Sequence, residues 1–128
     1  MDNRADVLVC VTGQKTCARL IREGAALAAR TGGTVSVVHV AEPGRAILGN
    51  HREGEALEYL FRASGEVGAD MTVLRAENAL NTLYEYAADK GVGCVVVGLG
   101  SGRSGNDFAE KLRMLLPGVD IRSVYEGS

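Results

Sequence analysis

Two glycine-containing stretches have the composition of phosphate-binding loops. The first, "VLVCVTGQKTC" at residues 7–17, contains Gln14-Lys15-Thr16, which resembles the Gly-Lys-Thr end of a triphosphate-binding loop. That motif needs Gly, four residues, then Gly-Lys-Ser/Thr, because its glycines let backbone N–H groups surround a phosphate. Val9 and Gln14 occupy both glycine positions. The stretch is therefore predicted to turn a strand into a helix, whose N-terminus can still make a weaker anion contact.

The second stretch is "GLGSGRSG", residues 98–105. Its glycines allow backbone N–H groups to converge on an anion, and its serines and Arg103 can add further donors. Gly98 and Gly100 begin a dinucleotide fingerprint, but Arg103 stands where the third glycine is required. The residues therefore leave two interpretations open, an anion-binding loop and a flexible structural turn.

The remaining reactive residues do not form a catalytic or metal-binding pattern. Cys10, Cys17 and Cys94 include no C-x-x-C pair, and Cys10 and Cys94 lie in apolar runs, which predicts buried, reduced thiols. His39 and His51 lack the spacing of zinc ligands. His39 lies near the end of a predicted strand, where we expect neighbours to satisfy its ring; a nucleobase contact or an acid–base role is the alternative. Without a nucleophile–base spacing or a carboxylate pair, the sequence predicts no enzyme and no metal site.

Composition limits the class of protein. A chain of 128 residues, 46% hydrophobic and 23% charged, fits one soluble domain over residues 1–128. Its formal charge of −2 provides no basic face for nucleic acid and no polybasic signal for anionic lipid. The apolar runs are shorter than the roughly 20 residues that span a bilayer, and the N-terminus does not have the pattern of a signal peptide. We therefore expect a cytoplasmic protein without a nucleic-acid or membrane partner.

Alternating apolar patterns predict an α/β fold. Short valine-rich runs predict strands at 6–11, 34–40, 70–75, 94–99 and 119–125. The first and fourth runs are almost entirely apolar, as central parallel strands should be, and the more polar third and fifth suit sheet edges. Between them, apolar residues recur at helical spacing in 15–33, 54–68, 78–91 and 106–118, with Asn78 expected as an N-cap and Gly91 as a C-terminal stop. The residues expected to face the core are Cys17, Leu20, Ile21, Ala25, Ala28, Ala29, Ala56, Leu57, Leu60, Phe61, Ala63, Leu80, Leu83, Tyr84, Ala87, Phe108, Leu112 and Leu115.

This order of elements predicts a doubly wound, Rossmann-like three-layer sandwich, with a parallel sheet and helices on both faces. Such folds bind ligands beyond the carboxyl ends of the strands, where the strand order reverses. The loops expected there are 12–16, 41–50 and 98–105.

Three long strings carry a resemblance to a known family. "VLVCVTGQKTCARLIREGAALAARTGGTVSVVHVAEPG" resembles the opening of a universal stress protein domain, and "NALNTLYEYAADKGVGCVVVGLGSGRSG" and "LRMLLPGVDIRSVY" resemble its later parts. Within that family, the chain is most similar to the domain carried by the osmosensing histidine kinase of the potassium-transport system. The resemblance implies five parallel strands in the order 3-2-1-4-5. It also implies a homodimer, commonly paired through the last strand, and a regulatory role with little or no hydrolysis.

The resemblance also implies an adenine-nucleotide site, with ATP or AMP as the ligand. Many members bind ATP through Gly-x2-Gly-x9-Gly-Ser/Thr after the fourth strand and an Asp at the end of the first. Gly102 and Gly105 match the first spacing, but Leu115 stands at the next glycine position and Thr12 at the Asp position. The triphosphate clamp is therefore degraded. The implied contacts are Thr12, Gly13 and Val40 near the nucleoside, and Gly98, Gly100, Ser101, Gly102 and Ser104 near the phosphates.

Two alternatives to ATP or AMP binding remain. The resemblance to the kinase-borne domain also implies a signalling domain that responds to cyclic di-AMP, whose phosphates a serine-rich loop such as "GSGRSG" could meet. Alternatively, the chain could be a ligand-free module that binds a signalling protein.

Overall fold

The computed structural model describes residues 6–11, 14–41, 52–99 and 103–125. Strands and helices alternate along these residues, as the apolar pattern predicts. Their order is β1 (Val7–Cys10), α1 (Gln14–Thr31), β2 (Val35–Ala41), α2 (Glu53–Glu66), β3 (Asp70–Arg75), α3 (Ala79–Lys90), β4 (Cys94–Leu99), α4 (Arg103–Leu115) and β5 (Asp120–Tyr125).

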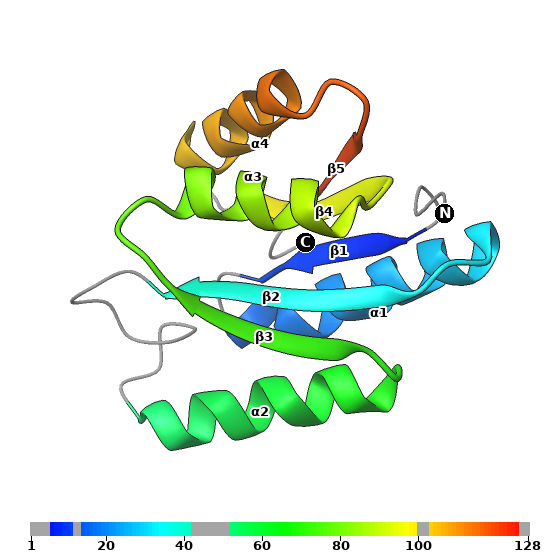
Figure 1. Cartoon of the computed structure of the whole chain (residues 1–128). Coiled ribbons are helices and arrows are strands. Elements are labelled where there is room, and N and C mark those ends of the chain that lie inside the picture. Colours follow the sequence, from blue (N-terminus) through cyan, green and yellow to red (C-terminus); the bar gives the residue numbers. More distant parts are fainter. Residues whose placement is uncertain (1–5, 12–13, 42–51, 100–102, 126–128) are drawn as a thin grey trace.

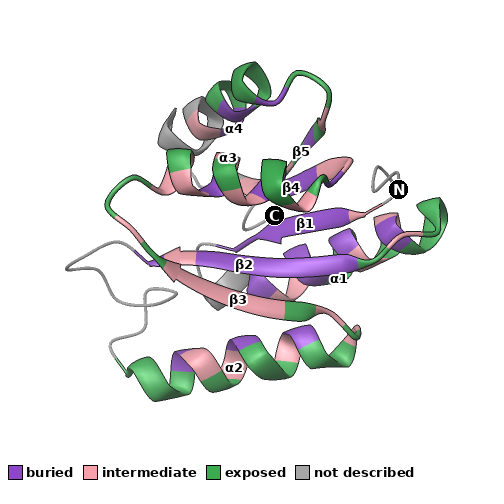
Figure 2. Ribbon diagram, viewed as in Figure 1, coloured by how far each residue is buried: buried purple, intermediate pink, exposed green. Residues whose placement is uncertain are grey.

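The strands form a single five-stranded sheet in the order β3-β2-β1-β4-β5, and every neighbouring pair is parallel (Figure 1). The predicted doubly wound fold and its strand order are thus confirmed. β1 lies at the centre, and the more polar strands β3 and β5 form the two edges. Figure 2 shows the same gradient, with buried residues along β1 and β2 and half-buried ones along β3.

Alternate residues of the strands point into two separate cores. One core joins β1 to α1 and α2 and contains Val9, Ile21 and Leu60. The other joins β1 to α3 and α4 and contains Leu8 and Leu112 among its buried residues. This two-sided arrangement follows from right-handed crossovers: those through α1 and α2 step from β1 towards β3, and those through α3 and α4 step in the opposite direction towards β5.

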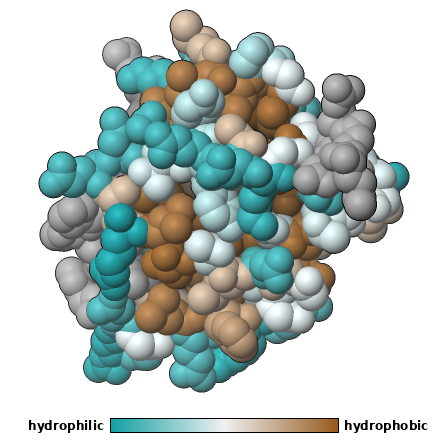
Figure 3. All heavy atoms as spheres, in the orientation of Figure 1, coloured by the Kyte–Doolittle hydropathy of each residue, from teal (hydrophilic) through white to brown (hydrophobic). Residues whose placement is uncertain are grey.

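Helix α3 has the ends that its sequence predicts. The Asn78 side chain accepts a hydrogen bond from the backbone N–H of Asn81 at 2.9 Å, as an N-cap should. Gly91 ends the helix with a φ of 65°, a left-handed conformation that glycine adopts without strain. In Figure 3, hydrophilic side chains over α3 form a band between the apolar surface over α4 and that over β2 and β3.

The apolar faces of the other helices are buried or half-buried at most of the predicted positions, with one exception in each helix. Ala29 is exposed, Phe61 is 70% exposed and Leu115 is 41% exposed, although each was expected in the core. Leu60, which was also predicted in the core, is fully buried, and Phe61 lies about 100° further around the helix. An apolar residue beside a buried one satisfies the helical spacing, and only packing decides which of the two faces the sheet.

Candidate functional site

The candidate site lies at the carboxyl ends of β1 and β4, where the strand order reverses. β1 pairs with β2 as far as Cys10↔Val38 and with β4 as far as Cys10↔Val97. The connection through α1 leads from β1 to β2, whereas β4 is reached from β3 through α3 on the other face. The connections that follow β1 and β4 run to opposite faces of the sheet, which leaves a crevice between the ends of these two strands. Ligands usually bind there in this architecture.

Three of the eight predicted contacts lie within the described residues. Val40 and Gly98 are both half-buried, each one residue before the end of its strand, β2 and β4. Because these strands flank β1, the two residues lie at the same edge of the sheet on either side of the β1 end. Ser104 is the second residue of α4. The others, Thr12, Gly13, Gly100, Ser101 and Gly102, lie outside the described residues.

The helices that begin beside the switch point have first turns suited to an anion. Neither α1, which begins at Gln14, nor α4, which begins at Arg103, has an acidic residue in its first turn. By contrast, α2 begins with Glu53 and Glu55, and the side chain of Asn78 already caps α3. A helix N-terminus carries unpaired N–H groups and about half a positive charge. The first turns of α1 and α4 therefore carry no acidic side chain that would repel an anion, a contrast with α2 that becomes visible once the helix starts are known.

The connection from β4 to α4 is too short for the triphosphate motif of the family. β4 ends at Leu99 and α4 begins at Arg103, so only residues 100–102 join them. Leu115, at the position of the missing glycine, is the last residue of α4. At 1.5 Å per residue it lies about 18 Å along the helix from Arg103. That position cannot approach a phosphate at the start of α4.

The ring of His39 holds the end of β1. Its Nδ1 lies 2.9 Å from the carbonyl oxygen of Val11. Because a carbonyl oxygen only accepts, Nδ1 carries the hydrogen and donates it. His39 is 5% exposed and Val11 is fully buried, so the bond is shielded from water. The expectation that neighbours satisfy this ring is confirmed.

The cysteines are free thiols with little tendency to ionise. Burial raises the pKa of Cys10 to about 12 and that of Cys17 to about 11. Cys94 is only half-buried; burial raises its pKa first and the charge of Asp120 next, against a smaller opposing effect of Arg122. The prediction of a buried thiol holds for Cys10 and only in part for Cys94, which pairs with Asp120 of the edge strand β5. Protonated thiols are poor nucleophiles.

Within the described residues, no group of three or more His, Cys, Asp or Glu side chains could hold a metal ion. In the same part of the chain, none of the helices combines the length and apolar character needed to cross a membrane.

The sequence and the fold both match known proteins. The model of the universal stress protein family matches residues 4–109. A universal stress protein in complex with cAMP aligns with a TM-score of 0.68 and 16% identity, over 99% of this chain and 100% of that one. A universal stress family protein from Burkholderia pseudomallei gives 0.68 and 19%, over 97% and 98%. The universal stress protein from Archaeoglobus fulgidus in complex with dAMP gives 0.56 and 16%, over 98% of each chain.

A comparison with curated protein sequences gives no match. At these identities the structural similarities establish the fold alone, which is the doubly wound sheet described above. The family model, however, covers most of the chain, from before β1 into α4. The chain therefore belongs to the universal stress protein family.

Proposed function

We propose that this chain is a single-domain regulatory module over residues 1–128 that binds an adenine nucleotide without turning it over. The ligand lies at the carboxyl edge of the sheet, between the ends of β1 and β4. One observation carries this proposal: the two helices that begin at the switch point, α1 and α4, lack acidic residues in their first turns, whereas α2 has two and the Asn78 side chain caps α3, which also lacks them. A phosphate placed there meets favourable helix dipoles and unpaired N–H groups.

The geometry favours a single phosphate group over a triphosphate. The short β4–α4 connection and the distant Leu115 remove the part of the family motif that would hold the outer phosphates. Two of the similar structures hold adenine nucleotides with one phosphate, cAMP and dAMP. AMP is accordingly the proposed ligand, and ATP binds no more tightly than AMP.

The predicted contacts divide between the two sides of the crevice. Thr12, Gly13 and Val40 are assigned to the nucleoside side. Gly98, Gly100, Ser101, Gly102 and Ser104 are assigned to the phosphate side, and the position of Ser104 in the first turn of α4 supports this division.

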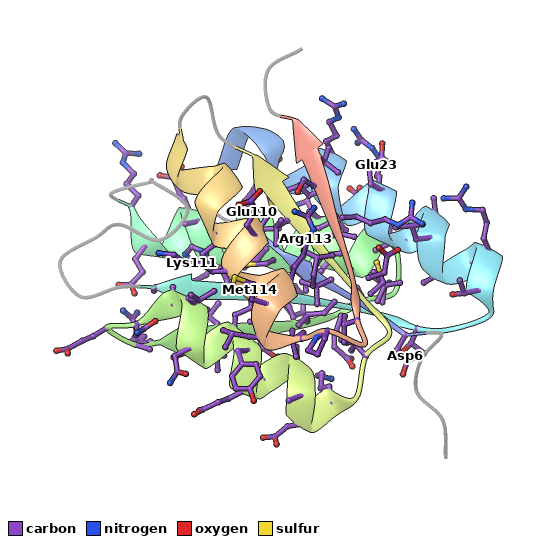
Figure 4. The ribbon with its side chains drawn as sticks, turned by 90° about the horizontal axis from the view of Figure 1, so that it is seen from above. Asp6, Glu23, Glu110, Lys111, Arg113 and Met114 are labelled. Atoms are coloured by element: carbon purple, nitrogen blue, oxygen red, sulfur yellow. The ribbon has the colours of Figure 1, made fainter. Side chains whose placement is uncertain are left out.

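The same proposal includes a homodimer that pairs through β5. Asp120 donates its N–H to Gly93 and so faces β4, which directs the backbone groups of Ile121 and Ser123 outward from the edge. Arg113 of α4 donates to the outward carbonyl of Ile121 at 3.2 Å. Figure 4 shows Arg113 on the β5 side of α4 and Lys111 on the opposite side. A second β5 strand that pairs at this edge must therefore share the Ile121 carbonyl with Arg113 or displace the Arg113 side chain.

The likeness to the potassium-system histidine kinase adds two elements to the proposal. The chain works in the cytoplasm, and it passes nucleotide occupancy to a signalling protein. The structural support is general: β5 is an edge strand of the sheet, next to β4, whose carboxyl end lies at the proposed ligand site.

A thermal-unfolding panel tests the proposed ligand. Ligand that binds only the folded state stabilises it by about 2.7 kcal/mol at one hundred times its dissociation constant. We expect AMP to raise the midpoint in proportion to the logarithm of its concentration, and ATP to give no larger shift. A larger response to cyclic di-AMP would replace AMP by that ligand. Flat curves with all three at millimolar concentration would reject nucleotide binding and favour the ligand-free interaction module.

A further inference from the structure

We propose that His39 is a positioning residue that fixes the end of β1 against β2 and thereby sets the geometry of the nucleoside side of the site. The effect on ligand affinity rests on the proposed function. The effect on the end of β1 does not, since it concerns only the protein.

The hydrogen bond continues the strand pairing where the regular ladder ends. β1 and β2 pair from Val7↔Val35 to Cys10↔Val38, and the N–H of Val11 still donates to Val38 at 3.0 Å. The next acceptor along β1 is the Val11 carbonyl, which receives the Nδ1 hydrogen of His39 at 2.9 Å. Both backbone groups of Val11 are thus held by β2, one by its backbone and one by a side chain.

Burial makes this bond hard to replace. Val11 is fully buried and His39 is 5% exposed, so water cannot take the place of the ring as a donor. A buried carbonyl without a donor is strongly unfavourable. Without His39, the end of β1 would have to shift until the Val11 carbonyl found another donor or reached solvent.

The bond joins the residues that immediately precede the proposed nucleoside contacts. Val11 is followed in the chain by Thr12 and Gly13, and His39 by Val40. Side chains alternate along a strand, so His39 lies on the α1 and α2 face with Val37, and Val40 lies on the other face with Val38. His39 therefore acts on the site through the backbone of Val11 rather than through contact with the nucleoside at Val40.

Three substitutions separate this role from ordinary core packing. His39→Asn keeps an N–H donor near the Nδ1 position, whereas His39→Leu keeps much of the volume and removes the donor. Val37→Ala is the matched control: Val37 is fully buried on the same strand and face, two residues before His39, and its loss leaves the Val11 carbonyl bonded.

The first measurement needs no ligand. Amide hydrogen exchange at Val11, observed by NMR in each folded variant, reports whether the end of β1 opens. Loss of one buried hydrogen bond should speed exchange at Val11 about tenfold in His39→Leu relative to Leu8 of the same strand. His39→Asn should restore slow exchange at Val11. Val37→Ala should change the exchange rates of Val11 and Leu8 by the same factor. Equal exchange in His39→Leu and the wild type would overturn the positioning role.

The second measurement is the AMP dissociation constant by calorimetry, at a temperature where circular dichroism shows every variant folded. We expect His39→Leu to weaken AMP about tenfold, with His39→Asn and Val37→Ala within about threefold of the wild type. Equal losses of AMP affinity in all three variants would mean that His39 contributes only to core packing. If the wild type binds no AMP, the proposed function fails, and the exchange data still decide whether His39 positions β1.

Discussion

Gly24 of α1 lies directly against Val9 of β1, so closely that a Cβ at Gly24 would overlap the Cγ2 of Val9. Val9 is fully buried at the centre of the sheet, with β2 and β4 on either side. It cannot retreat without disturbing its neighbours. The close approach sets the distance between α1 and the sheet, and α1 begins at the proposed site.

We therefore predict that Gly24→Ala destabilises the protein, although alanine favours helix formation over glycine by up to about 1 kcal/mol. Overpacking costs about 1–3 kcal/mol and should outweigh that gain. The matched control is Gly65→Ala in α2, where a new Cβ would meet nothing within 4 Å. Urea denaturation should show a loss of stability for the first and a small gain for the second. A gain for both would mean that α1 does not sit this close to β1.

The buried thiols predict a loss of stability at high pH. Folding raises the pKa of Cys10 to about 12 and of Cys17 to about 11 from an ordinary 9.0. Below pH 9 the thiols are protonated in both states and their contribution is fully present. As the pH rises from 9 towards these folded values, only the unfolded chain ionises. The free energy of unfolding should then fall by up to about 1.4 kcal/mol per pH unit for each thiol.

The measurement compares unfolding free energies at pH 8 and pH 10.5 for the wild type and a Cys10→Ala, Cys17→Ala double variant. Other groups titrate in this range, so the difference between the two proteins isolates the thiols. An identical pH dependence in both would show that these thiols are not protected from ionisation by folding.

Adding a negative charge at Ser104 should separate fold stability from ligand binding. An acidic residue in the first turn of a helix typically stabilises it by about 0.3–1 kcal/mol. The same charge would repel a phosphate at the start of α4. Ser104→Asp should therefore raise the unfolding midpoint without ligand and lower the affinity for AMP.

Asn81→Asp is the control for this charge effect. Asn81 is exposed in the first turn of α3, so its substitution adds the same charge at another helix start of the same sheet edge. The affinity for AMP should stay near the wild-type value in Asn81→Asp. An equal loss in both variants would indicate a general effect of net charge and would count against a phosphate at α4.

Arg113 should oppose pairing between β5 edges. Its donation to Ile121 occupies an outward carbonyl that a second β5 strand would use. Arg113→Ala should tighten the proposed homodimer in sedimentation experiments, whereas Lys111→Ala on the opposite side of α4 should leave it unchanged. A dimer weakened by Arg113→Ala would show that Arg113 supports the interface instead, and a monomer in every case would exclude pairing through β5.

Much of the fold could be predicted because local patterns and tertiary structure agree. Apolar runs identified the strands, and their polar content correctly assigned β3 and β5 to the edges. Asn78 and Gly91 marked the ends of α3 through backbone geometry that those residues favour anywhere. These signals depend on a few neighbouring residues and need no knowledge of the rest of the chain.

The remaining features depend on contacts between distant segments. Phe61 and Leu60 fit the helical spacing almost equally well, and only the position of α2 against the sheet buries Leu60 and exposes Phe61. The contact of Gly24 with Val9 and the bond of His39 to Val11 join residues of different elements. The acid-free first turns of α1 and α4 are present in the sequence but acquire meaning only when both helices are known to begin at one crevice.

A two-dimensional NMR titration of the isotope-labelled protein with AMP tests the central claim most directly. The account predicts saturable chemical-shift changes concentrated at Val11, Val40 and Gly98 and in the first turns of α1 and α4. It predicts little change along α2 or at the β5 edge. Saturable changes centred on α2 or β5, or no saturable change at millimolar AMP, would contradict a nucleotide site at the ends of β1 and β4.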